Sequence, residues 1–206
     1  VKHLVLDKLI EVEEQLEPYK ALRYAKDLVK MYDSMANVTI YNKVATRLRL
    51  GENFFYVDSL QHALEEERKA YRMAMKAGDS NLLSYVRQNL ASTFEEMGEK
   101  DSCLYYARLA YDLNAANRFS CLLTFASAYI SVDSLNQAFS LLKQAMPKTA
   151  EDRYSVFYFQ SQAAMKAQDY KMAETFSDSA CCYLQEMYRT ASKAKISYYT
   201  SFLKKE

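Results

Sequence analysis

The stretch N-L-A-S-T-F-E-E-M-G-E-K-D-S-C-L-Y-Y-A-R-L-A, residues 89–110, contains the spacing that decides the fold. Three small residues stand in it, Ala91, Cys103 and Ala110, separated by 12 and then by 7 positions. Where two helices of a hairpin cross, only a short side chain lets their axes approach to about 8–10 Å. The stretch therefore predicts a helical hairpin with its turn near Gly98.

The same spacing of small residues recurs along most of the chain. Downstream it repeats twice with a period of 35 residues, and upstream it returns after 40 residues, with a weaker trace at Ala21 and Leu28. Each set has a first, a second and a third small-residue position. Besides the set quoted above, the sets are, in that order, Gly51, Ala63 and Ala70; Ala126, Ala138 and Ala145; and Ser161, Ala173 and Ala180. A period of this length is typical of a solenoid of stacked helical hairpins.

Composition favours an all-α fold. Only three glycines and two prolines occur among 206 residues, which leaves few of the turns that β-hairpins need. Apolar residues recur at steps of three and four, as expected of helices with one buried face. The predicted helices cover about 2–16, 18–36, 41–56, 59–77, 80–97, 102–115, 119–131, 134–146, 151–167 and 170–203. Aspartates are expected to cap five of them by accepting hydrogen bonds from first-turn amides, namely Asp58, Asp79, Asp101, Asp133 and Asp169.

The units resemble the tetratricopeptide repeat (TPR), a helix–turn–helix of 34 residues. Leu50-Gly51-x-x-Phe54 and Leu90-Ala91-x-x-Phe94 match its first-helix motif, and Phe125-Ala126-x-x-Tyr129 is similar, whereas Gln160-Ser161-x-x-Ala164 lacks the aromatic residue. The resemblance implies a right-handed superhelical array. We expect one continuous solenoid domain over 1–206, with a weak first unit at 1–43, repeats at about 44–83, 84–118, 119–153 and 154–188, and a C-terminal capping helix to 206.

Residues that could carry catalysis or hold a cofactor are scarce. The two histidines, His3 and His62, are far apart, no glycine-rich phosphate loop is possible, and no metal-ligand spacing occurs. The run Glu65-Glu66-Glu67 is expected to be a solvated helix face, since consecutive helix residues point in different directions. We therefore predict no enzyme activity, cofactor or metal. The cysteines are expected to be packed thiols, although a bridge between Cys103 and Cys121 stays possible.

Charge and hydropathy bear on the partners of the chain. Basic and acidic residues are balanced at 27 and 26 and are mixed along the sequence, so no basic footprint for nucleic acid is visible. No stretch approaches the roughly 18 consecutive apolar residues of a membrane helix. The sequence begins at valine and stops in a charged helix, and it is expected to be a piece of a longer protein.

A second resemblance concerns biological context. Glu13-Glu14-x-Leu16-x-Pro18-x-x-Ala21-Leu22 is similar to the opening of envelope-associated repeat proteins of Bacteroidetes-type bacteria, although Tyr19-Lys20 replace the usual Asp-Ser. Six Asp-Ser dipeptides point to the same group. The resemblance implies the sensory or scaffold part of a larger bacterial regulator, exposed to the periplasm or cell envelope. A cytoplasmic location remains the alternative.

The resemblance implies a protein-binding module whose first helices line a concave face that holds a peptide or partner segment. The expected partner-binding residues on that face are Phe55, Gln88, Ser92, Leu123, Ser127, Ile130, Tyr158, Gln162 and Met165, with Leu48, Glu52 and Glu95 beside them. Some members of the family bind a C-terminal carboxylate through paired lysine, asparagine and arginine residues. In this sequence only Asn89 falls at a matching position. The alternative is a structural or self-associating spacer. Its groove would be filled by its own terminal helix, through Ile196, Tyr199 and Leu203, or by a second copy of the chain in a homodimer.

Overall fold

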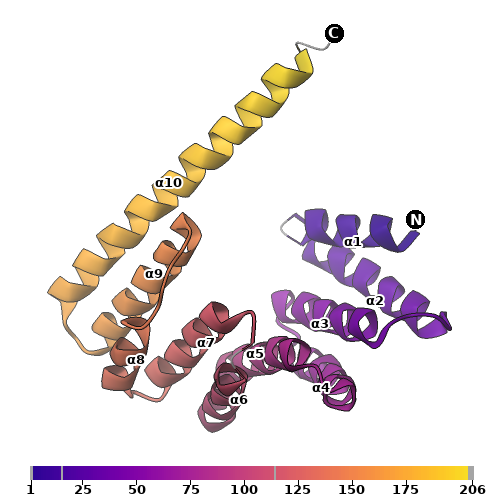
Figure 1. Cartoon of the computed structure of the whole chain (residues 1–206), viewed down its shortest axis with the longest axis horizontal. Helices are drawn as coiled ribbons and strands as arrows, with labels where there is room; N and C mark the ends of the chain where they lie inside the picture. Colours follow the sequence, from indigo (N-terminus) through magenta and orange to yellow (C-terminus); the bar gives the residue numbers. More distant parts are fainter. Residues whose placement is uncertain (1, 15, 114, 204–206) are drawn as a thin grey trace. The chain divides into compact units, whose positions relative to one another are not determined.

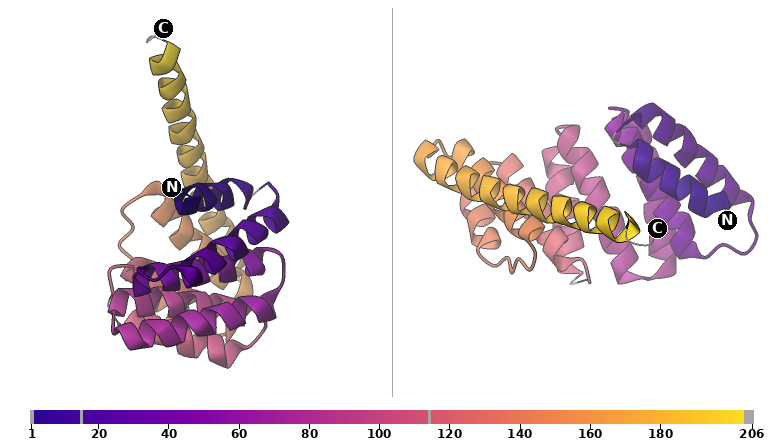
Figure 2. Two further views of the ribbon diagram at one scale, coloured as in Figure 1. Left: turned by 90° about the vertical axis from the view of Figure 1, so that its right-hand side faces the viewer. Right: turned by 90° about the horizontal axis from the view of Figure 1, so that it is seen from above.

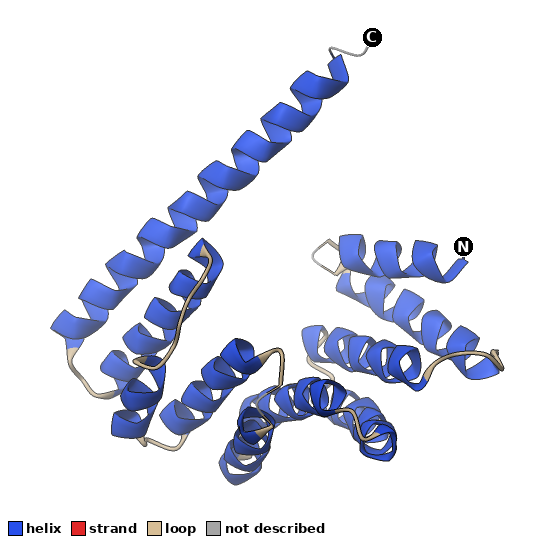
Figure 3. Cartoon of the chain, viewed as in Figure 1, coloured by secondary structure: helices blue, strands red, loops and turns tan. Residues whose placement is uncertain are grey.

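The computed structural model describes residues 2–14, 16–113 and 115–203, with side chains described only as far as residue 191. In these ranges the chain forms ten α-helices and no strand (Figure 3), which confirms the all-α prediction. Figure 1 labels the helices α1 to α10. No helix in the described part combines the length and the apolar character needed to cross a membrane.

Consecutive helices form antiparallel hairpins, and the predicted helices match them closely. The chain divides into two compact units, 1–124 and 125–206, with the division inside α7, and each is described by itself. The helix bounds are α1 Lys2–Glu13, α2 Pro18–Ser34, α3 Ile40–Tyr56, α4 Leu60–Ala77, α5 Ser80–Glu96, α6 Lys100–Asp112, α7 Arg118–Ser131, α8 Leu135–Leu142, α9 Ala150–Lys166 and α10 Tyr170–Leu203. That all repeats belong to one domain stays a prediction.

The small-residue positions lie in the core, as the repeat spacing predicts. Eleven of the twelve positions are buried, from Gly51 in α3 to Ala180 in α10. The exception is Ala145, which is only half-buried because α8 ends at Leu142 and not near residue 146 as predicted. Pro147 follows shortly, and a proline disfavours helical conformation in the residue before it. The shortened helix leaves Ala145 outside the hairpin crossing.

The same turn joins the two helices of four hairpins, and it corrects part of the predicted capping. Asp58, Gly98, Asp133 and Gln168 all have positive φ, between 57° and 74°. In each turn the next amide bonds back to the carbonyl oxygen five residues earlier, from Ser59 to Phe54, Glu99 to Phe94, Ser134 to Tyr129 and Asp169 to Ala164. This is the Schellman arrangement that ends helices at a left-handed residue. Its recurrence shows that the hairpins are structural repeats.

Aspartates therefore play two different parts. Asp79 and Asp169 accept hydrogen bonds from first-turn amides and cap α5 and α10 as predicted. Asp58 and Asp133 occupy the left-handed turn position instead, which aspartate tolerates better than most residues, and α4 and α8 begin after them without a side-chain cap. Asp101 lies inside the first turn of α6, since that helix begins at Lys100.

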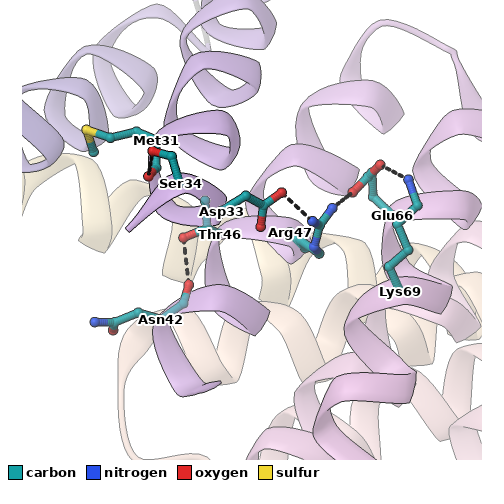
Figure 4. A network of polar contacts seen from close by, with 8 residues as sticks. All are labelled: Met31, Asp33, Ser34, Asn42, Thr46, Arg47, Glu66 and Lys69. Atoms are coloured by element: carbon teal, nitrogen blue, oxygen red, sulfur yellow. Dashed lines mark hydrogen bonds and ion pairs between the residues drawn. The ribbon is translucent and has the colours of Figure 1, made fainter. Parts of the chain in front are cut away.

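In the first unit, an ion-pair network ties three helices together (Figure 4). Arg47 of α3 contacts Asp33 of α2 at 2.6 Å and Glu66 of α4 at 2.7 Å, and Glu66 also accepts a hydrogen bond of 2.6 Å from Lys69. Arg47 and Glu66 are largely shielded from solvent, whereas Asp33 and Lys69 are not. One guanidinium thus links α2, α3 and α4 at the edge of the core.

In the second unit, α9 packs along the first half of α10. With 34 residues α10 is twice as long as α9, and its second half continues past α9 (Figure 2). Among the side chains of α10 described up to residue 191, Ala173 and Ala180 are buried, while Tyr188 is exposed. The prediction that Ile196, Tyr199 and Leu203 cover an apolar strip falls on side chains outside the described part.

Candidate functional site

A cavity of about 200 Å³ opens among α3, α4 and α5 in the first unit. Its lining residues come from both hairpins around it: Glu52, Phe55 and Tyr56 from α3, Glu67 from α4, and Asn89, Ser92 and Thr93 from α5. Five of the six residues on α3 and α5 are exposed or half-buried, and only Thr93 is buried. This is expected of first helices that line a groove. The cavity therefore joins the predicted binding face to the interior of the repeat.

Glu67 is the buried acid of this cavity. Its side chain is 1% exposed, and its Oε1 accepts a hydrogen bond of 2.8 Å from the Thr93 hydroxyl. Its other oxygen, Oε2, is buried and has no hydrogen-bond partner among the described residues. Burial, opposed by the Thr93 hydrogen bond and reinforced by the nearby charge of Glu52, raises the pKa of Glu67 to about 7. Near neutral pH the group can hold or release a proton.

The buried acid departs from the pattern of the repeat. Glu67 stands four residues after the second small-residue position, where the next two repeats have Ala107 and Leu142, both buried. Gly51 makes room for it: a Cβ atom at Gly51 would lie 3.2 Å from the Cγ atom of Glu67, closer than most such contacts. The other repeats have alanine or serine there. Gly51 and Glu67 therefore depart from the repeat pattern together, because the absence of a side chain at Gly51 leaves room for that of Glu67.

Glu52 contributes a second carboxylate at the cavity. Asn89 donates a hydrogen bond of 3.1 Å to its Oε1, and the side chain keeps part of its surface in solvent. Desolvation by the surrounding protein raises the pKa of Glu52, against the effects of Asn89 and Arg49. Because Asn89 faces a carboxylate of the chain itself, the site is poorly suited to capture a carboxylate from a partner.

The structure places the predicted partner-binding residues of the first unit in different surroundings. Phe55 and Ser92 line the cavity together. Gln88 is half-buried, and its amide bonds Asn117, Thr124 and Ser120, so that it ties α5 to the start of α7. Leu123 is half-buried in α7.

In the second unit, the predicted residues lie on α7 and α9. Tyr158 and Met165 are 43% and 52% exposed, Gln162 is exposed between them, and Ser127 and Ile130 are half-buried. The ring of Tyr158 stacks on that of Tyr154, with 6.1 Å between centroids. Residues at steps of three and four on one helix share a face, so α9 presents a partly apolar strip.

Three lining residues were missed from the sequence: Tyr56, Glu67 and Thr93. The prediction that Glu65-Glu66-Glu67 forms a solvated face is wrong for two of them, because Glu66 points toward Arg47 and Glu67 into the cavity, while Glu65 alone is exposed. The available signal was the repeat itself, which puts an apolar residue at the position of Glu67 in the next two units. Among the described residues no cluster of three or more acidic, histidine or cysteine side chains could hold a metal ion.

Comparison with known proteins finds similarity in structure alone. No protein-family model matches the sequence, and no curated protein matches it. Solved structures that are similar include the apo form of RapI, at 15% identity with a TM-score of 0.76, covering 95% of this chain and 73% of that one. The TPR-like repeats of a kinesin light chain from Podosopora anserina give 12% identity and a TM-score of 0.67, covering 91% and 95%.

A third similar structure is BtubC from P. vanneervenii, at 14% identity with a TM-score of 0.69, covering 89% of this chain and 80% of that one. At such identities the similarity establishes the fold and nothing further. The repeated hairpins, the recurring turn and these structures agree. The chain has the fold of the TPR-like helical repeat proteins.

Proposed function

We propose that this chain is a non-catalytic interaction module of the TPR type, which holds an extended peptide segment of a partner protein against the first helices of its hairpins. Solenoids of helical repeats build extended binding surfaces from their geometry. The observation that carries the proposal is the cavity between α3 and α5, lined by Phe55 and Ser92 at predicted positions.

The test is selection of binding peptides from a displayed random library, followed by calorimetry with the tightest synthetic peptide. Phe55→Ala and Tyr158→Ala each remove a ring from a first helix, and at least one should weaken binding about tenfold or more, as an aromatic contact at a binding site does. Tyr105→Ala is the matched control, since Tyr105 is 60% exposed on the second helix α6. Equal losses for all three variants, or no selected peptide, would overturn the proposal.

We further propose that the module is the sensory or scaffold part of a larger bacterial regulator. This rests on the resemblance of the segment from Glu13 to Leu22, which joins α1 to α2, and on the Asp-Ser dipeptides. Reading the gene on both sides of the sequence tests it. A membrane helix or signalling module in the same frame supports the proposal, and an unrelated arrangement contradicts it.

The alternative function, a self-associating spacer, is favoured by one observation. The second half of α10 extends beyond α9, and Leu184 and Tyr188, near the middle of α10, are 37% and 71% exposed. A second copy could cover such a helix. Light scattering at increasing concentration separates the two functions: a stable dimer supports the spacer, and a monomer that binds selected peptides supports the interaction module.

A further inference from the structure

We propose that the cavity among α3, α4 and α5 is a specificity pocket for one basic side chain, a lysine or an arginine, of the bound peptide. Two carboxylates line it: Glu67, which is buried, and Glu52, which keeps part of its surface in solvent. The inference rests on the proposed function, because it presupposes a peptide held along the first helices. It adds the chemical class of residue that the peptide must present.

The charge of the lining selects a cation. The described residues around the cavity include two carboxylates and no lysine or arginine. Phe55 and Tyr56 line the same space, and their ring faces attract an ammonium or guanidinium group, more strongly when it is desolvated. A neutral or anionic side chain would gain neither interaction.

The unpartnered oxygen of Glu67 indicates a missing donor. Its Oε2 is buried without a hydrogen bond, and a buried polar atom left in this state costs about 1–3 kcal/mol. The fold does not require this acid, since Ala107 and Leu142 occupy the same position in the next repeats. An N–H group of a bound lysine or arginine would supply the donor that the free protein lacks.

The size of the cavity fits a side chain and not a larger ligand. Sites for drug-sized molecules and cofactors usually measure about 300–1,000 Å³, whereas this cavity measures about 200 Å³. Ser92, a predicted binding-face residue, both lines the cavity and is exposed, so a side chain could enter there while the peptide backbone stays on the surface.

The pocket gives binding a pH dependence with a definite sign. A cation binds the ionised form of Glu67. Because the pKa of Glu67 is about 7, this carboxyl is protonated at lower pH and must lose its proton before the cation can bind. Affinity should therefore fall by up to about tenfold per pH unit below 7 and level off above it. The groups that face Glu67 and Glu52 include Thr93 and Asn89 of α5, Arg49 and Tyr56 of α3, and Glu14, which follows α1.

The experiment uses the whole chain and fluorescein-labelled heptapeptide mixtures whose central residue is fixed as lysine, arginine, glutamine or norleucine. Fluorescence anisotropy should show at least about tenfold tighter binding for the lysine or arginine mixtures, as for a desolvated charge pair. Glu67→Gln should abolish this preference and the pH dependence. Glu65→Gln is the matched control, because it removes the same charge from an exposed position of the same helix. A preference that survives in Glu67→Gln would overturn the inference.

A second measurement separates this inference from the proposed function. Titration with n-butylammonium, followed by the amide NMR signals of Asn89 and Thr93, probes the pocket without any peptide. Shifts in the wild type that vanish in Glu67→Gln support the pocket even if no peptide binds, in which case only the proposed function fails. Peptides that bind with equal affinity whatever their central residue leave the proposed function standing and overturn the pocket. Stronger shifts with calcium chloride would reassign it to a metal ion and also overturn the inference.

Discussion

The hydroxyl of Thr93 on α5 donates a hydrogen bond of 2.8 Å to Oε1 of Glu67 on α4, and it is the partner that the structure gives to that buried carboxyl. The bond crosses from one hairpin to the next, and at the position of Glu67 the next two repeats pack alanine and leucine. It holds an acid in the core with one oxygen hydrogen-bonded and the other buried without a partner among the described residues. This half-satisfied acid makes stability depend on pH.

We predict that Glu67→Gln stabilises the chain at pH 8 and much less at pH 5. The folded pKa of about 7 lies above the ordinary value of 4.5, so the folded state binds the proton more tightly. Ionisation of Glu67 therefore lowers the free energy of unfolding. This loss is absent below pH 4.5 and complete above pH 7, where a pKa shift of this size corresponds to about 3 kcal/mol. Urea unfolding at the two pH values measures it. Glu65→Gln should show no comparable pH dependence, and a destabilised Glu67→Gln at pH 8 would contradict the prediction.

The crossing of the hairpins should not tolerate a large charged side chain. Ala138 is fully buried in α8 at the second small-residue position. Ala138→Arg should destabilise the chain by more than about 3 kcal/mol, since overpacking alone costs about 1–3 kcal/mol and a buried unpaired charge adds to it. Its neighbour Gln137 is exposed, so Gln137→Arg serves as control. Similar melting temperatures for the two variants would contradict the placement of Ala138 in the core.

The ion pairs of Arg47 should matter more than those on the surface. Arg47→Met leaves the shielded carboxylate of Glu66 with Lys69 alone and should cost at least about 2 kcal/mol. Lys8→Met breaks the exposed pair with Glu11 and should cost less than about 1 kcal/mol. Denaturant unfolding of both variants tests the difference. An equal and small effect would mean that the network of Arg47 adds no stability.

The thiols should divide into two classes. Cys103 and Cys121 are buried and Cys181 and Cys182 are exposed, and none is in a disulfide. A thiol reagent should therefore modify two cysteines quickly and the other two only on unfolding, while a reductant leaves the melting temperature unchanged. Loss of the Cys103 and Cys121 thiols from the count, together with a lower melting temperature on reduction, would reveal a structural disulfide.

The repeat could be predicted from sequence because close packing of helices leaves a periodic trace in residue size. Ala91, Cys103 and Ala110 are all fully buried, as this spacing predicts, and the helices themselves follow from apolar residues at steps of three and four. The turns were misread because aspartate suits both a helix cap and a left-handed turn, and the side chain of Asp58 alone does not distinguish them.

The candidate site was predicted only in part. Phe55 and Ser92 follow from their place on the first helices, but Glu67 belongs to a second helix and lies in a run of three acids. Whether such an acid faces water or the core depends on which face of its helix is turned toward the neighbouring helices. Comparing position by position with Ala107 and Leu142 would have placed Glu67 in the core, and the glycine at Gly51 would have supported it.

Mapping a bound peptide by NMR tests most directly whether the cavity among α3, α4 and α5 is the binding site. The tightest selected peptide with a central lysine is added to the labelled chain, and the amide shifts are assigned along both helices of each hairpin. If the peptide is held over the cavity, the largest shifts fall on Phe55, Asn89 and Ser92, which line it. Shifts concentrated on exposed second-helix residues such as Arg72 and Tyr105, with the cavity residues unchanged, would contradict this placement of the peptide.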